Sequence, residues 1–137
     1  MIAIVLIVSS AAIALSLGVL HLVFTFRGPK FLPRDPSLQI RMEEIAPVIS
    51  KQTTMWRCWI GFNASHSMGV ILFGLIYGYL AITHAALLFQ SPFLLVVGLG
   101  MLLGYAVLAK LYWFIIPFTG ISLALGCYVL GVVAALY

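Results

Sequence analysis

The chain has very few charged residues. Only 7% of its 137 residues are Asp, Glu, Lys or Arg, whereas 64% are hydrophobic. An average soluble domain has about 25% charged residues, so a soluble fold of this size could not cover its surface with the charges present. The composition therefore excludes a soluble enzyme, a nucleic-acid-binding module and a disordered tail, and it indicates an integral membrane protein.

Acidic residues are missing from every long apolar stretch. The three that exist are Asp35, Glu43 and Glu44, which lie close together in the sequence. Carboxylate proton relays, di-iron carboxylate sites and intramembrane aspartyl proteases all need a carboxylate within the bilayer. A covalent nucleophile would need an activating base, and neither Cys58 nor Cys127 has an obvious one in the sequence. The sequence thus gives no support to an enzymatic activity.

The charges leave three charge-free runs, at residues 1–26, 58–109 and 111–137. A spanning helix needs about 20 apolar residues, so the outer runs supply one span each and the middle run supplies two. Ser91 and Pro92 form a helix-start signal, and we expect Pro117 to open the last span in the same way. The prediction is an all-α bundle of four transmembrane helices in a single domain. The spans are expected at residues 2–26, 56–83, 92–110 and 117–136.

The first 26 residues do not have the pattern of a signal peptide. They lack a basic region before the apolar run, and that run is longer than the 7–15 residues typical of a signal sequence. We therefore expect a retained first span.

The basic residues indicate the orientation of the chain. All seven Lys and Arg lie either between residues 27 and 57 or at Lys110, which is one side of a four-span bundle. The positive-inside rule then predicts a multi-pass protein of the cytoplasmic (inner) membrane, with both termini outside the cytoplasm and a cytoplasmic loop at residues 27–55. An interfacial aromatic belt is expected on the same side, formed by Trp56, Trp59, Tyr112 and Trp113.

The loop between the first two spans is the one polar segment. Leu38, Met42, Ile45 and Ile49 recur in it at helical spacing, which predicts a helix lying on the membrane surface and broken near Pro47. The segment is either a lid or partner-docking element, or a connector whose basic residues bind anionic headgroups. It contains no glycine-rich phosphate loop and no long basic run, so we expect no nucleotide or nucleic-acid site.

Two histidines and several neighbouring polar residues lie at a similar depth inside the first two spans. His21 is six residues before Arg27, and His66 is nine residues after Arg57, which places them roughly 9 and 13 Å below the same membrane surface. Polar side chains at such depth usually face the bundle interior and are candidates for function. The candidate ligand-binding residues are His21, Thr25, Asn63, His66 and Ser67.

Several ligands suit this cluster. The imidazoles of His21 and His66 could be axial ligands of a haem or another metal; one imidazole could ligate a chlorin or bind a quinone carbonyl. Nearby glycines, Gly18, Gly61 and Gly69, would leave room for a flat ring. The first hypothesis is therefore a protein that binds a lipophilic small molecule or redox cofactor.

The second hypothesis is a structural accessory subunit of a larger membrane complex, in which the same polar groups only bridge helices. A transporter or channel is disfavoured because no inverted halves and no intramembrane charge are apparent. A third histidine, His84, is expected among the outer headgroups at the far end of the second span.

Small residues recur at four-residue spacing in every span. Such pairs let helix backbones approach closely in lipid, so we expect them to pack the four helices against one another. An alternative is a face for a homo-oligomer or a larger complex on the last two spans. The pairs are Ala14 and Gly18, Gly74 and Gly78, Gly100 and Gly104, and Gly120 and Ala124.

Residues 56–69 read Trp-Arg-Cys-Trp-Ile-Gly-Phe-Asn-Ala-Ser-His-Ser-Met-Gly. This segment, with its W-x-G-F-N-x-S-H pattern, resembles a signature of small bacterial four-helix integral membrane proteins to which no activity is assigned, and residues 21–26 are similar to an earlier part of the same pattern. The resemblance implies a bacterial membrane source. It also draws attention to the same histidine and asparagine residues.

Overall fold

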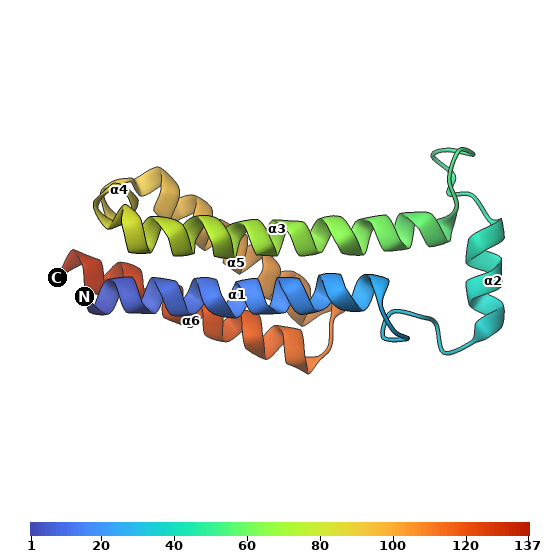
Figure 1. The fold of residues 1–137 in the computed structure, drawn as a ribbon, viewed down its shortest axis with the longest axis horizontal. Coiled ribbons are helices and arrows are strands. Elements are labelled where there is room, and N and C mark those ends of the chain that lie inside the picture. The colour runs from blue at the N-terminus through green and yellow to red at the C-terminus, as the bar shows by residue number, and fades with distance from the viewer. The chain divides into compact units, whose positions relative to one another are not determined.

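The computed structural model describes all residues from Met1 to Tyr137 and contains only helices. This confirms the predicted all-α fold class (Figure 1). The six helices are α1 (Ile2–Phe26), α2 (Pro36–Glu44), α3 (Met55–Thr83), α4 (Ala85–Gln90), α5 (Pro92–Tyr112) and α6 (Ile115–Leu136).

Four of the helices, α1, α3, α5 and α6, are long and apolar enough to cross a membrane. The shortest of them, α5, has 21 residues and is therefore roughly 31 Å long, about the thickness of the hydrocarbon core. The other three are longer, and α3 has 29 residues. The chain thus has the architecture of a multi-pass membrane protein.

Two helices were predicted to begin at a proline, and the structure confirms only one of these starts. Ser91 is the N-cap of α5, with Pro92 at its first position, and the Ser91 hydroxyl accepts a hydrogen bond from the Leu94 N–H at 3.3 Å. The same prediction for Pro117 was wrong, because α6 already begins at Ile115. The first-turn N–H groups of a helix have no intrahelical partner, so a proline at the third position removes no hydrogen bond.

The chain forms two compact units, which are described separately. Unit 1 consists of residues 1–17 and 70–137, and unit 2 consists of residues 18–69. Helices α1 and α3 each contribute residues to both units. The single-domain organisation stays a prediction.

Unit 1 has a core of stacked aromatic rings. The rings of Phe73 and Tyr77 in α3 stack with centroids 4.6 Å apart, and Tyr77 makes an edge contact with Tyr128 of α6 at 5.8 Å. The two tyrosine hydroxyls donate to backbone carbonyls of α5, Tyr77 to Leu94 at 2.6 Å and Tyr128 to Leu95 at 3.0 Å. A buried tyrosine usually finds such a partner for its hydroxyl. The two bonds tie α3 and α6 to the same turn of α5.

Gly74 marks a close approach of α3 to α1. A Cβ added at Gly74 would lie 2.6 Å from the Cβ of Leu15 and 2.7 Å from the carbonyl oxygen of Ala11. One turn later, a Cβ at Gly78 would make an ordinary contact of 3.5 Å with the Cβ of Ala11. Small residues on α3 therefore do pack against α1 within unit 1, and Gly74 is the tighter position.

The prediction that Gly100 and Gly104 pack against another helix of the chain was wrong. A Cβ at either position would meet nothing within 4 Å, and both glycines line an apolar surface hollow of about 230 Å³. The close approach in α5 is at Gly98 instead, where a Cβ would lie 2.7 Å from ring atoms of both Tyr77 and Tyr128. Each helical residue turns by about 100°, so Gly100 lies on nearly the opposite side of α5 from Gly98.

In unit 2 the chain turns back at the end of α1. The turn needs Gly28, whose φ of +83° lies in the left-handed region that glycine adopts without strain. Asp35 then caps α2: its carboxylate accepts from the Ser37 N–H and the Ser37 hydroxyl, both at 2.9 Å. These two hydrogen bonds to Ser37 lower the pKa of the exposed Asp35 carboxyl.

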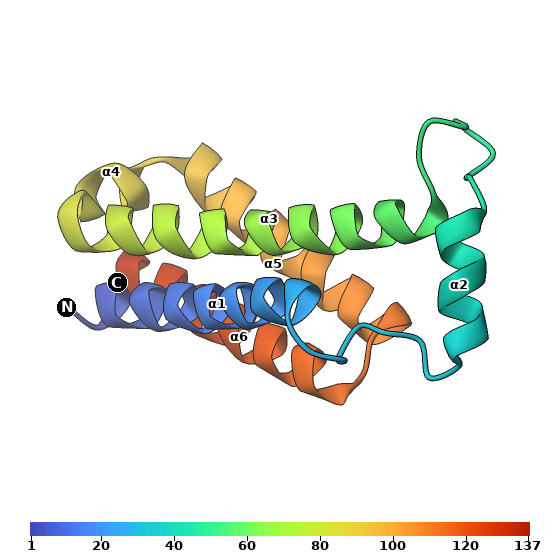
Figure 2. The same ribbon diagram turned by 45° about the vertical axis from the view of Figure 1, so that its right-hand side comes forward.

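Helix α2 ends close to the predicted break near Pro47, and it covers only part of the predicted apolar pattern. It ends at Glu44, and Ile49 lies outside it in a loop that follows Pro47. A proline disfavours helical geometry in the residue before it, which accounts for the early end. No residue of α2 is buried, and Figures 1 and 2 both show α2 running across the direction of the adjoining parts of α1 and α3.

Candidate functional site: a histidine–asparagine cluster

Unit 2 brings together three of the five candidate residues. His21 comes from the last turns of α1, and Asn63 and His66 come from the first half of α3. The Nε2 of His21 lies 3.1 Å from the Oδ1 of Asn63. The rings of His21 and His66 meet edge to face, with centroids 5.2 Å apart and planes at 67°. The two histidines, predicted to share a depth, are therefore in direct contact.

The buried Asn63 amide fixes the orientation of this hydrogen bond. Its Nδ2 donates to the carbonyl oxygen of Trp59, one turn earlier in α3, at 2.8 Å. The other end of the amide, Oδ1, is therefore an acceptor, so the Nε2 of His21 must carry a proton and donate it. A neutral imidazole has one protonated nitrogen, and the Nδ1 of His21 is consequently the atom with the lone pair.

The other two candidates, Thr25 and Ser67, use their hydroxyls locally. Thr25 donates to the carbonyl of His21 at 2.8 Å, and Ser67 donates to the carbonyl of Asn63 at 2.8 Å. Both bonds are to the residue four positions earlier on the same helix, and both residues are buried. Thr25 and Ser67 thus form hydrogen bonds with the backbone of His21 and Asn63. Because their hydroxyl protons are used in these bonds, they are weaker candidates for direct contact with a ligand.

Two aromatic residues complete the cluster, and the sequence did not mark them as site residues. Phe31, in the loop after α1, lies edge to face against the His21 ring at 4.6 Å. The indole N–H of Trp59 donates to the Phe31 carbonyl at 3.2 Å. The Gly28-Pro29 sequence signals a chain reversal, but it does not indicate which later side chain returns to α1.

The second histidine also has an aromatic neighbour on its own helix. The ring of Phe62 is nearly parallel to that of His66, with centroids 6.4 Å apart and planes at 15°. Phe62 is exposed, whereas His21 and His66 are partly buried. A Cβ at the adjoining Gly61 would meet nothing within 4 Å. The cluster therefore opens to the surroundings along the side of α3 that carries Gly61 and Phe62.

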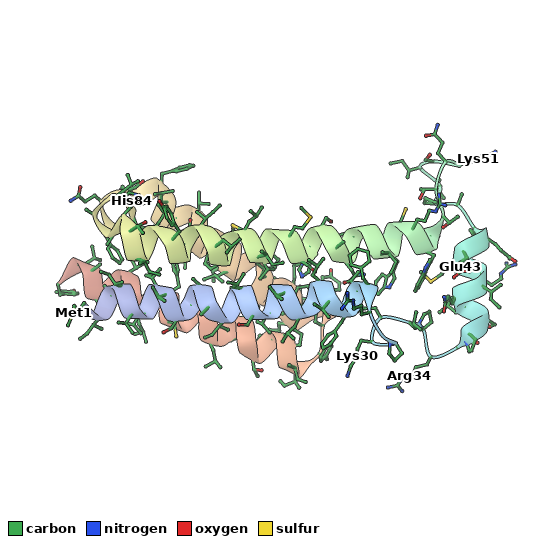
Figure 3. All side chains as sticks on the ribbon, in the orientation of Figure 1. Met1, Lys30, Arg34, Glu43, Lys51 and His84 are labelled. Carbon is green, nitrogen blue, oxygen red and sulfur yellow. The ribbon has the colours of Figure 1, made fainter.

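Exposed basic residues occupy the segment that separates His21 from Asn63 and His66 in the sequence. Lys30 directly precedes Phe31 in the sequence. Its ammonium group lies over the Phe24 ring, 5.6 Å from the ring centroid. Figure 3 shows Lys30 and Arg34 near the turn that follows α1. All six basic residues of unit 2 are exposed: Arg27, Lys30, Arg34, Arg41, Lys51 and Arg57.

The arrangement does not fit a haem held by both histidines. The His21 and His66 rings are in edge contact with each other, so no macrocycle can lie between them in this geometry. The Nε2 of His21 is also engaged with Asn63. No group of three or more His, Cys, Asp or Glu side chains is placed to hold a metal ion. What the cluster offers is hydrogen bonding beside aromatic rings.

Comparisons with protein-family models, with curated proteins and with solved structures give no match to this chain.

Proposed function

We propose that the His21–Asn63–His66 cluster binds the polar ring of a lipophilic small molecule of the quinone and quinol type. The observation that carries this proposal is the hydrogen-bond chain from His21 through Asn63 to the Trp59 carbonyl, which holds one imidazole in a defined tautomer. The same chain also links α1 to α3, and it leaves the Nδ1 of His21 as the acceptor that a ligand hydroxyl needs.

The tautomer of His21 specifies what the ligand must supply. Because its Nε2 donates a hydrogen bond to Asn63, the Nδ1 of His21 can act only as an acceptor, and a quinol hydroxyl is a suitable donor to it. The quinol form is therefore expected to bind more tightly through His21 than the quinone form, whose carbonyl can only accept.

The aromatic neighbours suit a flat ring. Phe31 contacts His21 from the loop side, and Phe62 stacks beside His66 on α3. Aromatic rings prefer offset-stacked or edge-to-face contacts at centroid distances of about 4.5–7 Å, so a ligand ring placed beside Phe62 gains stacking in addition to its hydrogen bond. The long apolar tail of such a ligand would remain in the lipid.

The test is a titration of the purified protein in detergent with a short-chain ubiquinol and, separately, with the corresponding quinone. Binding is followed by quenching of tryptophan fluorescence, because Trp59 is part of the cluster. Asn63→Leu removes the acceptor that orients His21. Loss of one hydrogen bond of about 1 kcal/mol predicts about a fivefold weaker Kd for quinol. His84→Ala, just beyond the opposite end of α3, is the matched control and should bind as the unmodified protein does.

The His21→Phe variant provides a second measurement, since it keeps a ring against Phe31 and His66 but removes the hydrogen bond. Thermal unfolding with and without quinol separates a loss of binding from a loss of folding. Equal quinol affinity in Asn63→Leu, His21→Phe and His84→Ala would contradict the proposal. Variants that only lose stability, together with a stoichiometric partner that copurifies, would instead favour an accessory subunit of a membrane complex.

We further infer that the protein lies in a bacterial cytoplasmic membrane with both termini outside the cytoplasm. The one-sided distribution of Lys and Arg in the sequence supports the orientation, and the resemblance of residues 56–69 supports the bacterial source. Cys58 is exposed and belongs to the first turn of α3, so it reports the side on which unit 2 lies. A membrane-impermeant maleimide should label Cys58 only after cells are permeabilised, and a Cys58→Ser variant is the control. Labelling of intact cells would reverse the topology.

A further inference from the structure

The loop between α2 and α3 ends in an exposed apolar tip. The Ser50 N–H donates to the Pro47 carbonyl at 3.2 Å, which closes a turn with Val48 and Ile49 at its two corners. Val48 is completely exposed, and Ile49 is 93% exposed. Turn corners are usually Gly, Asn, Asp, Ser or Pro, and β-branched apolar residues usually lie in strands or cores. These two side chains contact almost nothing in the protein.

Basic residues flank the tip. Lys51 lies two residues after Ile49, and Arg57 lies in the first turn of α3; both are exposed. Unit 2 has six basic and three acidic residues, so its net charge is 6 − 3 = +3. Two of the carboxylates have neutral partners: Asp35 accepts from Ser37, and Glu43 accepts from Gln39 at 2.9 Å. Positive charge on this unit is thus available to an outside anion.

The tip is also held next to a membrane-spanning helix. The Met55 N–H, at the first residue of α3, donates to the Ile45 carbonyl at 2.8 Å and closes the base of the loop. Figures 1 and 2 both show the loop projecting to the side of the start of α3 instead of continuing along its axis, and Figure 3 places Lys51 on it. A bilayer crossed by α3 therefore has its surface beside this loop.

We propose that the Val48–Ile49 tip inserts into the bilayer at the boundary between headgroups and acyl chains, and that Lys51 and Arg57 bind the headgroups of anionic phospholipids there. Apolar side chains that enter the interface beside cations that stay at headgroup level are the physical basis of surface anchoring. The loop is then an anchor that holds unit 2 against the membrane. This inference does not depend on the ligand of the histidine cluster.

The experiment measures the depth of single labels on the full-length protein in vesicles. In a Cys58→Ser, Cys127→Ser background, Ile49→Cys or Gln52→Cys carries an environment-sensitive fluorophore; Gln52 is exposed on the same loop and is the matched control. Vesicles contain phosphatidylcholine alone or mixed with phosphatidylglycerol. The label at position 49 should be quenched by brominated lipid and protected from aqueous iodide, and the label at position 52 should show the reverse. Equal iodide quenching at both positions in both vesicle types would overturn insertion and point to a protein partner for the tip.

A charge variant tests the lipid preference. Lys51→Gln with Arg57→Gln should leave the label at position 49 unchanged in phosphatidylcholine but reduce its protection in the anionic vesicles. The expected loss in preference for the anionic lipid is about fivefold for each cation removed, and it should shrink as salt is added. Equal insertion in both vesicle types, with no effect of the variant, would overturn the anionic headgroup as the partner of these cations.

Discussion

Gly74→Ala is expected to destabilise the protein by about 1–3 kcal/mol, the usual range for a side chain forced into a packed position. The new Cβ would lie 2.7 Å from the Ala11 carbonyl oxygen and 3.0 Å from the Leu15 Cα. Both atoms belong to the backbone of α1, so the strain cannot be relieved by a change of rotamer, and the two helices must separate. The measurement is thermal unfolding of the detergent-solubilised protein by circular dichroism.

Gly78→Ala is the matched control for this prediction. It makes the same chemical change one turn away on the same helix, where the nearest atom, the Ala11 Cβ, is 3.5 Å from the new methyl group. It should be neutral or slightly stabilising, because alanine is a better helix former than glycine. A Gly74→Ala protein that melts at the same temperature as Gly78→Ala would show that α1 and α3 do not approach as closely as described.

Gly98→Ala is expected to have an effect of similar size or larger, for a different reason. Its Cβ would overlap the ring of Tyr128 and lie 2.7 Å from the Tyr77 ring. Each ring is held in place by its hydroxyl bond to α5. Moving the rings would break one or both bonds, each of which contributes roughly 1 kcal/mol, in addition to the overpacking of about 1–3 kcal/mol. Gly100→Ala, two residues away in open space, should be tolerated.

A double-mutant cycle separates the steric part of this effect. Tyr128→Phe removes the hydroxyl that a Cβ at Gly98 would meet most closely. Gly98→Ala should therefore be less harmful in the Tyr128→Phe protein than in the unmodified one, since residues in contact give non-additive effects. Strict additivity of the two changes in unfolding free energy would mean that the two sites do not touch.

The spanning helices could be predicted because hydropathy and charge act over whole segments. The ends of the helices were predictable only where a capping residue and a proline together allow a single starting position. Ser91 followed by Pro92 fixes the start of α5, whereas Pro117 fits any position in an unpaired first turn, and the sequence therefore misplaced the start of α6 by two residues. The short helix α4 lies between the second and third predicted spans, where no helix was predicted, since six residues carry too little periodicity to be recognised.

Close packing was predicted less well than helix position. The search for small residues at four-residue spacing finds places where backbones approach, as at Gly74. Gly98 was overlooked because what approaches it is a pair of tyrosine rings, and no spacing rule encodes that. Gly100 and Gly104 have the expected spacing but face away from the chain's own helices. Spacing shows which residues share a face of a helix, and only the tertiary fold decides what that face contacts.

In the candidate site, the similar membrane depths estimated for His21 and His66 from their spacing to the flanking arginines predicted that the two would be neighbours. The structure places their rings in contact. The partner of His21 was not predictable from depth alone, since Asn63, Ser67 and Thr25 were equally plausible. The choice follows from the backbone: Thr25 and Ser67 each reach their own helix, and the longer Asn63 side chain can reach both Trp59 and His21. The contact of Phe31 with His21 could not be predicted without knowing the path of the loop after α1.

The tyrosine bonds to α5 have a consequence for how the chain assembles in the bilayer. An unpaired hydroxyl is unfavourable in hydrocarbon, and the acceptor of Tyr77 lies only 17 residues further along the chain, on the next spanning helix. Tyr77 therefore gains its partner as soon as α5 follows α3 into the membrane, which favours entry of the two helices as one hairpin. Tyr128 belongs to the last helix, and its acceptor on α5, 33 residues earlier, is already in place when α6 arrives. Insertion of the helices in chain order would thus give each hydroxyl its acceptor when its helix enters the bilayer.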